Sequence, residues 1–252
     1  MKKFKVFLDA GHNFAPPDTG AAGFGLREQD VTFEVADTVR ALLEFHGIEV
    51  RMSRRNLTDI LGRTLSESLS LRAEMSNNFG ADYCVSIHCN AGGGMGAETY
   101  AFKRGGLGDQ LAHKIQAQLV NVGMRNRGVK YSQDFFMLRR PIAPAVLVEL
   151  GFIDNANDND ILRNRQFELA KAVAIGIMEQ LGIDYNSKEE EFDVNESENR
   201  KEHWAKPFLE RLVSRGVVET PEAWIDFDAS VSRGAILALT EKLINYIRSD
   251  GK

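Results

Sequence analysis

Short apolar segments alternate with longer amphipathic segments along most of this chain, and this alternation limits its possible folds more than any other feature. The apolar segments have the length of buried strands, and the segments between them repeat apolar residues at helical spacing. The expected strands are 3–8, 49–53, 83–90, 98–102, 135–138 and 145–150, and the expected helices are 31–46, 61–79, 108–122, 158–163 and 166–181. This order predicts an α/β fold, in which a twisted, mostly parallel sheet is flanked by helices.

The composition changes near residue 185, which divides the chain into three predicted parts. Residues 1–184 contain the alternating segments and are long enough to bury the core of one α/β domain. Residues 185–202 are rich in acidic residues, Asn and Ser and nearly lack apolar side chains, as in a solvated linker. Residues 203–252 regain a helical pattern but can bury only a small core, so we expect a small helical module that binds a partner or pairs with a second copy.

The charge of the chain and its apolar runs exclude two classes of partner. The formal net charge is −5 and the pI about 5.6, so the chain has no basic surplus to neutralise the phosphates of a nucleic acid. No segment approaches the ~20 apolar residues of a membrane helix. The apolar run after Lys2 and Lys3 is also too short for a signal peptide, so we expect synthesis in the cytoplasm without an export signal.

Two cysteines, Cys84 and Cys89, lie in one expected strand. Their Cα atoms would be roughly 16 Å apart in an extended segment, which is beyond the reach of a disulfide. We therefore expect free thiols, which suit a protein that folds in a reducing compartment.

Three potential metal ligands follow strands or begin helices, where an α/β sheet presents its functional groups. His12 follows the first strand, Glu28 lies near the start of the first helix, and His88 ends the third strand. Two imidazoles and one carboxylate can hold zinc and leave a position open for water. Each residue also has a structural explanation: His12 as a loop histidine, Glu28 as a partner of the helix dipole, and His88 as an inward polar residue.

A fourth residue, Glu149, lies inside the apolar run AVLVELGF. A carboxylate in such a run is costly to bury unless it is paired, neutral or near a metal. Burial would raise its pKa and suit it to proton transfer near neutral pH. We therefore expect Glu149 to be catalytic.

Four blocks in this order resemble the zinc-dependent N-acetylmuramoyl-L-alanine amidases of the amidase_3 family: LDAGH (8–12), GLREQD (25–30), SLRAEMSNNFGADYCVSIHCNA (70–91) and PAVLVELGFIDNANDNDIL (144–162). The resemblance covers about residues 3–183. It implies one zinc ion per chain held by His12, Glu28 and His88, with Glu149 as the catalytic carboxylate. The first loop departs from the family pattern and keeps only Asp18 and Gly20-Ala21 in comparable places.

The resemblance implies hydrolysis of the amide bond between N-acetylmuramic acid and L-alanine in bacterial peptidoglycan, in a catalytic domain of residues 1–184. Asn90, just past His88, and Arg72, on the preceding helix, are candidate substrate-binding residues, although Arg72 could equally tie helix to sheet. Two alternatives have the same ligands or the same fold: a zinc peptidase that cuts within the stem peptide, and an inactive peptidoglycan-binding protein.

The C-terminal segment 203–252 is similar to a single S-layer-homology-type module, with His203-Trp204 at its start and Ser232-Arg233-Gly234 before its last helix. Such a module would bind a secondary wall polymer or associate with a second copy. The alternative is a helical appendage without either role. A wall hydrolase without an export signal would act on the wall after release, as a phage or prophage endolysin or as an enzyme of mother-cell lysis.

Overall fold

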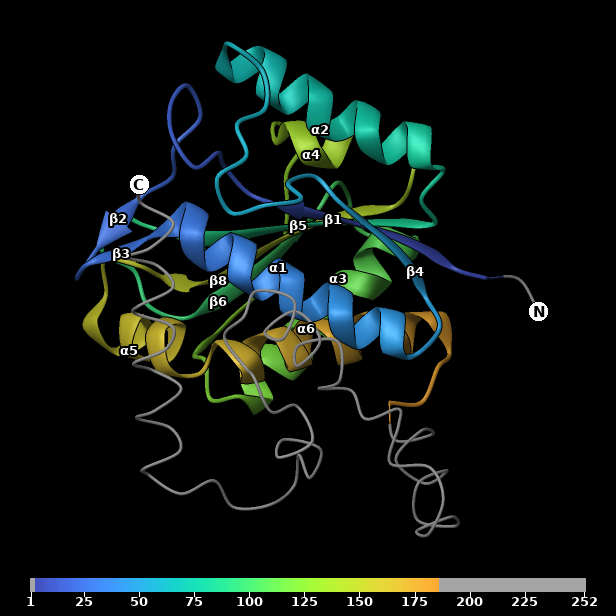
Figure 1. Ribbon diagram of the computed structural model, residues 1–252. Helices are drawn as coiled ribbons and strands as arrows, with labels where there is room; N and C mark the ends of the chain where they lie inside the picture. Colours follow the sequence, from blue (N-terminus) through green and yellow to red (C-terminus); the bar gives the residue numbers. More distant parts are fainter. Residues whose placement is uncertain (1–2, 186–252) are drawn as a thin grey trace, which may run out of the picture. The chain divides into compact units, whose positions relative to one another are not determined.

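The computed structural model describes residues 3–185, which form a six-stranded sheet with helices on both faces (Figure 1). The strand order is β4-β1-β5-β8-β6-β7, and all neighbouring strands are parallel except β6 and β8. The strands are β1 (Lys5–Ala10), β4 (Glu49–Met52), β5 (Tyr83–Asn90), β6 (Ala97–Ala101), β7 (Asn126–Tyr131) and β8 (Ala145–Phe152). This arrangement confirms the predicted α/β class with a mostly parallel sheet.

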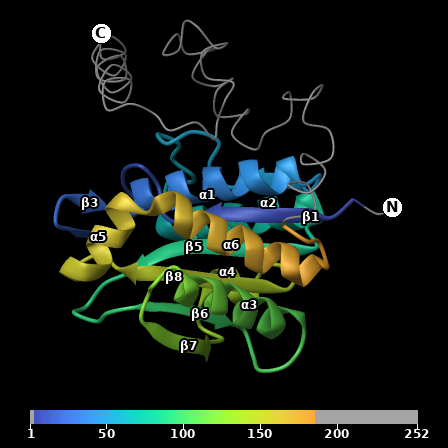
Figure 2. The same ribbon diagram turned by 90° about the horizontal axis from the view of Figure 1, so that it is seen from below.

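The helices cover the two faces unequally. Helices α1 (Glu28–Phe45), α3 (Leu107–Asn121) and α6 (Gln166–Leu181) lie together on one face, as Figure 2 shows from below. The other face carries α2 (Leu65–Phe79) and the single turn α4 (Phe136–Arg139) (Figure 1). The short helix α5 (Ala156–Asn164) follows β8, and a small hairpin of β2 (Ala22–Gly23) and β3 (Leu26–Arg27) precedes α1.

The central strands are apolar because helices cover both of their faces. Their side chains are fully buried at Phe7, Val85, Ile87, Val146 and Val148. On the α2 side, a cluster of buried residues joins β1, β5 and β8 to the two helices; it contains Phe7, Ala73, Phe79, Cys84, Met137, Leu138, Ala145 and Leu147. Cys84 and Cys89 are both buried and free, which confirms the expected thiols.

Strand register brings the chemical residues to one end of the sheet. The carboxyl ends of β1, β5 and β8 lie together because these three strands are parallel neighbours. His12 follows β1, and His88 on β5 is in register with Glu149 on β8. On the other side of β8, Glu149 lies opposite Glu98 of the antiparallel strand β6.

Three of the differences from the expected secondary structure have a clear physical reason. Residues 136–139 form a helix and not a strand, because a short apolar run alone does not distinguish the two. Strand β7, NRGVKY, was not predicted, since it is a polar edge strand without an apolar run. Helix α2 begins at Leu65 and not near Leu61, because the Thr64 side chain caps it by accepting a hydrogen bond from the Glu67 amide.

The predicted linker 185–202 and the helical module 203–252 lie outside the described residues apart from Tyr185, so both stay predictions. Within residues 3–185, none of the helices has the length and apolar character needed to cross a lipid bilayer.

Candidate active site

The structure brings His12, Glu28 and His88 together at the carboxyl end of the sheet. One nitrogen of each histidine and one carboxylate oxygen of Glu28 lie within 4.8 Å of one another. Glu28 Oε1 is 3.2 Å from His12 Nε2 and 3.1 Å from His88 Nδ1. Glu28 is buried at the first residue of α1, whereas the two imidazoles are partly exposed. The donors therefore converge on one point that solvent can reach.

Backbone features allow this close approach. A Cβ atom on Gly11 would lie 2.4 Å from the His88 ring, and one on Gly20 would lie 2.6 Å from Glu28 Oε2. A side chain at either position would therefore displace one of the three ligand residues. His12 itself has a φ of 64°, a left-handed backbone conformation that residues other than glycine rarely adopt. Strained backbone of this kind concentrates at functional sites, where the surrounding structure maintains it.

A second layer of groups fixes the orientation of the ligands. Asp18 Oδ1 lies 2.9 Å from His12 Nδ1, which leaves Nε2 directed at Glu28. The Ala21 amide donates to Glu28 Oε2 at 2.8 Å, and the Cys89 amide donates to Oε1 at 3.0 Å. Asp18, Gly20 and Ala21 are the residues of the first loop that match the family pattern, so that loop keeps the part which contacts the ligands.

These contacts set the charges of the cluster. Burial disfavours the Glu28 carboxylate, but hydrogen bonds from His12 and His88 outweigh it and hold the pKa of Glu28 well below its usual range. Burial also opposes the charge of His12, yet hydrogen bonds to Asp18 and Glu28 raise its pKa to about 9. Without a metal, a proton on His12 thus helps to balance the Glu28 anion, and a bound cation would replace it.

The donor set fits a zinc ion. Two imidazole nitrogens and one anionic carboxylate oxygen converge, the Asp18 contact fixes the tautomer of His12, and the exposed side leaves room for water. The three residues predicted from the sequence are thus close enough to share one cation.

Glu149 lies next to this cluster in a different environment. Its Oε2 atom is buried and has no hydrogen-bond partner among the residues that the structure describes. Burial raises the pKa of Glu149 to about 7, and the positive field of His88 only partly opposes that shift. A carboxyl group with this pKa can accept or donate a proton at neutral pH.

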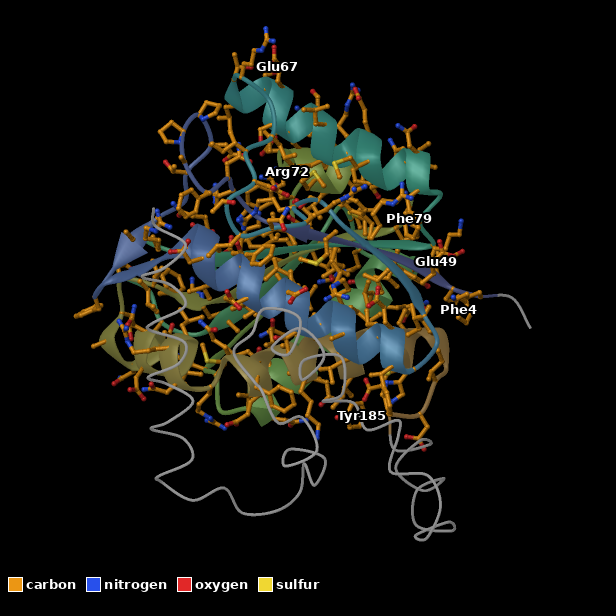
Figure 3. The ribbon with its side chains drawn as sticks, viewed as in Figure 1. Phe4, Glu49, Glu67, Arg72, Phe79 and Tyr185 are labelled. Atoms are coloured by element: carbon orange, nitrogen blue, oxygen red, sulfur yellow. The ribbon has the colours of Figure 1, made fainter. Side chains whose placement is uncertain are left out.

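Arg72 ties helix α2 to the sheet through several hydrogen bonds. It is 1% exposed, and Figure 3 shows it between α2 and the sheet. Its guanidinium donates to Asp9 Oδ1 at 2.7 Å and to the carbonyl oxygens of Ala10 and His12 at 2.7 and 2.5 Å. Although burial opposes the Asp9 charge, Arg72 lowers the pKa of Asp9 to about 2. Of the two roles considered for Arg72, these contacts support the tie between helix and sheet, and the substrate-binding role stays a prediction.

Asn90 contacts a carboxylate that the sequence analysis missed. Its side-chain amide donates to Glu98 Oε1 at 2.9 Å, and Tyr100 donates to the same oxygen at 2.9 Å. Glu98 is only 2% exposed. A lone acidic residue in the short strand AETYA was the available signal, since a carboxylate flanked by apolar or small residues has the same buried context as Glu149.

Comparisons with known proteins agree with this geometry. The family model described as N-acetylmuramoyl-L-alanine amidase (Amidase_3) matches residues 6–179. The N-acetylmuramoyl-L-alanine amidase CwlM of Bacillus licheniformis is 35% identical over 189 residues, covering 73% of this chain and 71% of the relative. An endolysin of Bacillus phage SPP1 is 33% identical over 189 residues, covering 71% of this chain and 66% of the relative.

The fold is also similar to that of a solved amidase. The CwlD amidase of Clostridioides difficile, whose structure was solved in complex with the GerS lipoprotein, superimposes with a TM-score of 0.66. It is 30% identical, and the match covers 72% of this chain and all of that one. The chain therefore belongs to the N-acetylmuramoyl-L-alanine amidase family and is an enzyme that hydrolyses an amide bond of bacterial peptidoglycan.

Proposed function

We propose that this amidase cleaves the bond between N-acetylmuramic acid and L-alanine, with one zinc ion per chain held by His12, Glu28 and His88. The observation that carries this proposal is the convergence of three ligand atoms beside a carboxyl group of raised pKa. When bound, zinc supplies Lewis acidity, which polarises a carbonyl oxygen and acidifies water.

Glu149 is the proton carrier in this proposal. Its carboxyl group accepts the proton of the attacking water, because no donor in the described residues holds its buried Oε2 atom in the charged form. The same group then donates that proton to the nitrogen of the leaving L-alanine, since an amine leaves poorly without one. Burial raises the pKa of Glu149 to about 7 in the metal-free chain, which keeps this carboxyl group within the range in which it can take up and return a proton.

Identification of new chain ends in digested peptidoglycan tests this proposal. Purified walls are treated with the zinc-loaded enzyme, and the newly exposed amino termini are labelled and identified. Free L-alanine amines are expected. Other new amino termini would indicate a peptidase acting within the stem peptide, and the absence of new termini would indicate a binding protein without activity.

We further propose that residues 203–252 concentrate the enzyme on the wall, through a secondary wall polymer or through pairing of two chains. Removal of the chain after residue 184 should then reduce activity on intact walls more than activity on soluble muropeptides. Equal losses on both substrates would contradict this role.

The proposed setting is lysis of a wall after release from the cytoplasm, in phage infection or in mother-cell lysis. The similarity to a phage endolysin supports the first of these settings. The genes that neighbour the coding sequence would test it, since a holin gene beside it is expected for a phage lysin.

A further inference from the structure

Next to Glu149 lies a pair of cations, Arg127 and Lys130, that neither the sequence analysis nor the proposed mechanism uses. Arg127 Nε and Lys130 Nζ each donate to Glu98 Oε2 at 2.5 Å. Both side chains are about one third exposed, whereas Glu98 is buried. The two cations therefore lie at the surface of the site, and the Glu98 carboxylate that they contact is buried below them.

A bulge in β7 brings the two cations to one point. Between the paired residues Ala97 and Thr99 of β6, the partner strand has one residue more, from Asn126 to Val129. In a regular strand, Arg127 and Lys130 would face opposite sides, because their separation is an odd number of residues. The extra residue, with Gly128 at a φ of 81°, allows both side chains to reach Glu98. Bulges of this kind redirect side chains beside active sites.

The charge of the pair exceeds what Glu98 requires. One cation would balance the Glu98 carboxylate, and the second leaves a net positive charge at the surface when Glu149, which lies opposite Glu98, is protonated. The terminal nitrogens of Arg127 have no hydrogen-bond partner in the described part of the chain, and the guanidinium carbon lies 4.8 Å from the centre of the Phe152 ring. A guanidinium held over a ring with free terminal N–H groups is suited to bind a carboxylate.

We propose that Arg127 and Lys130 bind a carboxylate on the leaving peptide, at the residue that follows L-alanine; this rests on the function proposed above. Glu98 and Glu149 lie directly opposite each other on antiparallel strands, which places their Cβ atoms about 5 Å apart. Glu149 delivers its proton to the L-alanine nitrogen, and two extended residues span about 7 Å. A peptide that runs from Glu149 across β6 therefore reaches the cation pair with its second residue.

Two muropeptides that differ in one group test this subsite. In one, the residue after L-alanine is a glutamate with a free α-carboxylate, and in the other that carboxylate is a carboxamide. The measured quantity is the ratio of kcat/KM between the two probes, for the zinc-loaded full chain. Both probes are measured on one preparation, so partial misfolding of a variant cancels from the ratio.

The wild-type enzyme should prefer the carboxylate probe, and Arg127→Gln should reduce that preference about tenfold, mainly through KM, because a charge-assisted hydrogen bond is lost. Lys130→Gln should reduce the preference in the same direction. Arg104→Gln is the matched control, because Arg104 is exposed and follows the far end of β6; its ratio should equal that of the wild type.

Unchanged ratios in both Arg127→Gln and Lys130→Gln would overturn the subsite, and so would an equal reduction in Arg104→Gln. In either case wild-type cleavage of both probes at the L-alanine bond would leave the proposed function intact. If the wild-type enzyme cleaves neither probe at that bond, the proposed function and the subsite both fail.

Discussion

Glu28, at the start of α1, and Glu149, inside β8, differ in the hydrogen-bond donors around their carboxylates. Several donors converge on the Glu28 carboxylate, whereas one carboxylate oxygen of Glu149 has no donor within the described residues. Glu28 is within hydrogen-bond distance of two backbone amides and two imidazoles. Its pKa is lowered and that of Glu149 is raised to about 7, although both carboxylates are largely buried in the same site. Burial alone does not determine the charge of a carboxylate; the donors around it do. This difference is consistent with the proposed roles, in which Glu28 is a fixed anion on the metal side and Glu149 is a proton carrier on the β8 side.

The largest expected effect comes from removal of a ligand on the metal side. His88→Ala should lose bound zinc and all measurable amidase activity, because two protein ligands no longer define the site. Zinc content by elemental analysis and release of L-alanine amines check this outcome. His113→Ala is the matched control, since His113 is an exposed histidine of α3. Full activity of zinc-free His88→Ala would contradict the division between the two regions.

On the β8 side, Glu149→Gln should keep zinc and fold but lose at least ~10²-fold in kcat, the usual scale for a proton-transfer group. Zinc content, the thermal unfolding midpoint and kcat are measured together. Glu74→Gln, which alters an exposed carboxylate on α2, should behave like the wild type. Loss of zinc from Glu149→Gln would show that Glu149 as well as Glu28 is needed to bind the metal.

The two carboxylates should also affect stability in opposite directions with pH. The folded-state pKa of Glu149 is raised from 4.5 to about 7, so between these values the native state binds more protons than the unfolded state. Stability of the metal-free protein should therefore fall as pH rises through this window, by about 3 kcal/mol relative to Glu149→Gln.

Glu28, with its lowered pKa, should contribute stability above pH 4.5 that is lost as the pH falls. Urea unfolding of the wild type, Glu149→Gln and Glu28→Gln at several pH values measures both slopes. If the contributions of Glu149 and Glu28 to the free energy of unfolding changed with pH in the same direction, the contrast between the metal side and the β8 side would be contradicted.

A smaller effect is expected from the second layer on the metal side. Asp18→Asn should weaken zinc binding by roughly ten- to a hundredfold, because His12 loses the anion that orients its ring. Glu149 should titrate as in the wild type, since Asp18 does not contact it. Zinc affinity is measured by competition with a chelator, and Asp134→Asn, at an exposed position, is the control. Unchanged zinc affinity in Asp18→Asn would show that His12 can bind zinc without a carboxylate that orients its ring.

The strand–helix alternation and the position of each ligand relative to a strand end could be predicted from the sequence. His12, Glu28 and His88 were accessible because parallel strands end at one edge whatever their order. Glu149 was accessible because a carboxylate in an apolar run is costly and therefore informative. The β7 edge strand and the α4 turn could not be predicted. A polar strand lacks apolar periodicity, and a short apolar run is compatible with either a strand or a helix.

The sequence by itself determined the fold class and the candidate residues for the chemistry, because apolar periodicity and isolated charges are local properties of the chain. The tertiary structure alone decided that Arg72 ties α2 to β1, that Asp18 orients His12 and that Glu98 holds Arg127 and Lys130. It also decided which glutamate keeps its charge. These outcomes depend on donors and acceptors far apart in the sequence, and only strand register, a bulge and the packing of α2 bring them within hydrogen-bond distance.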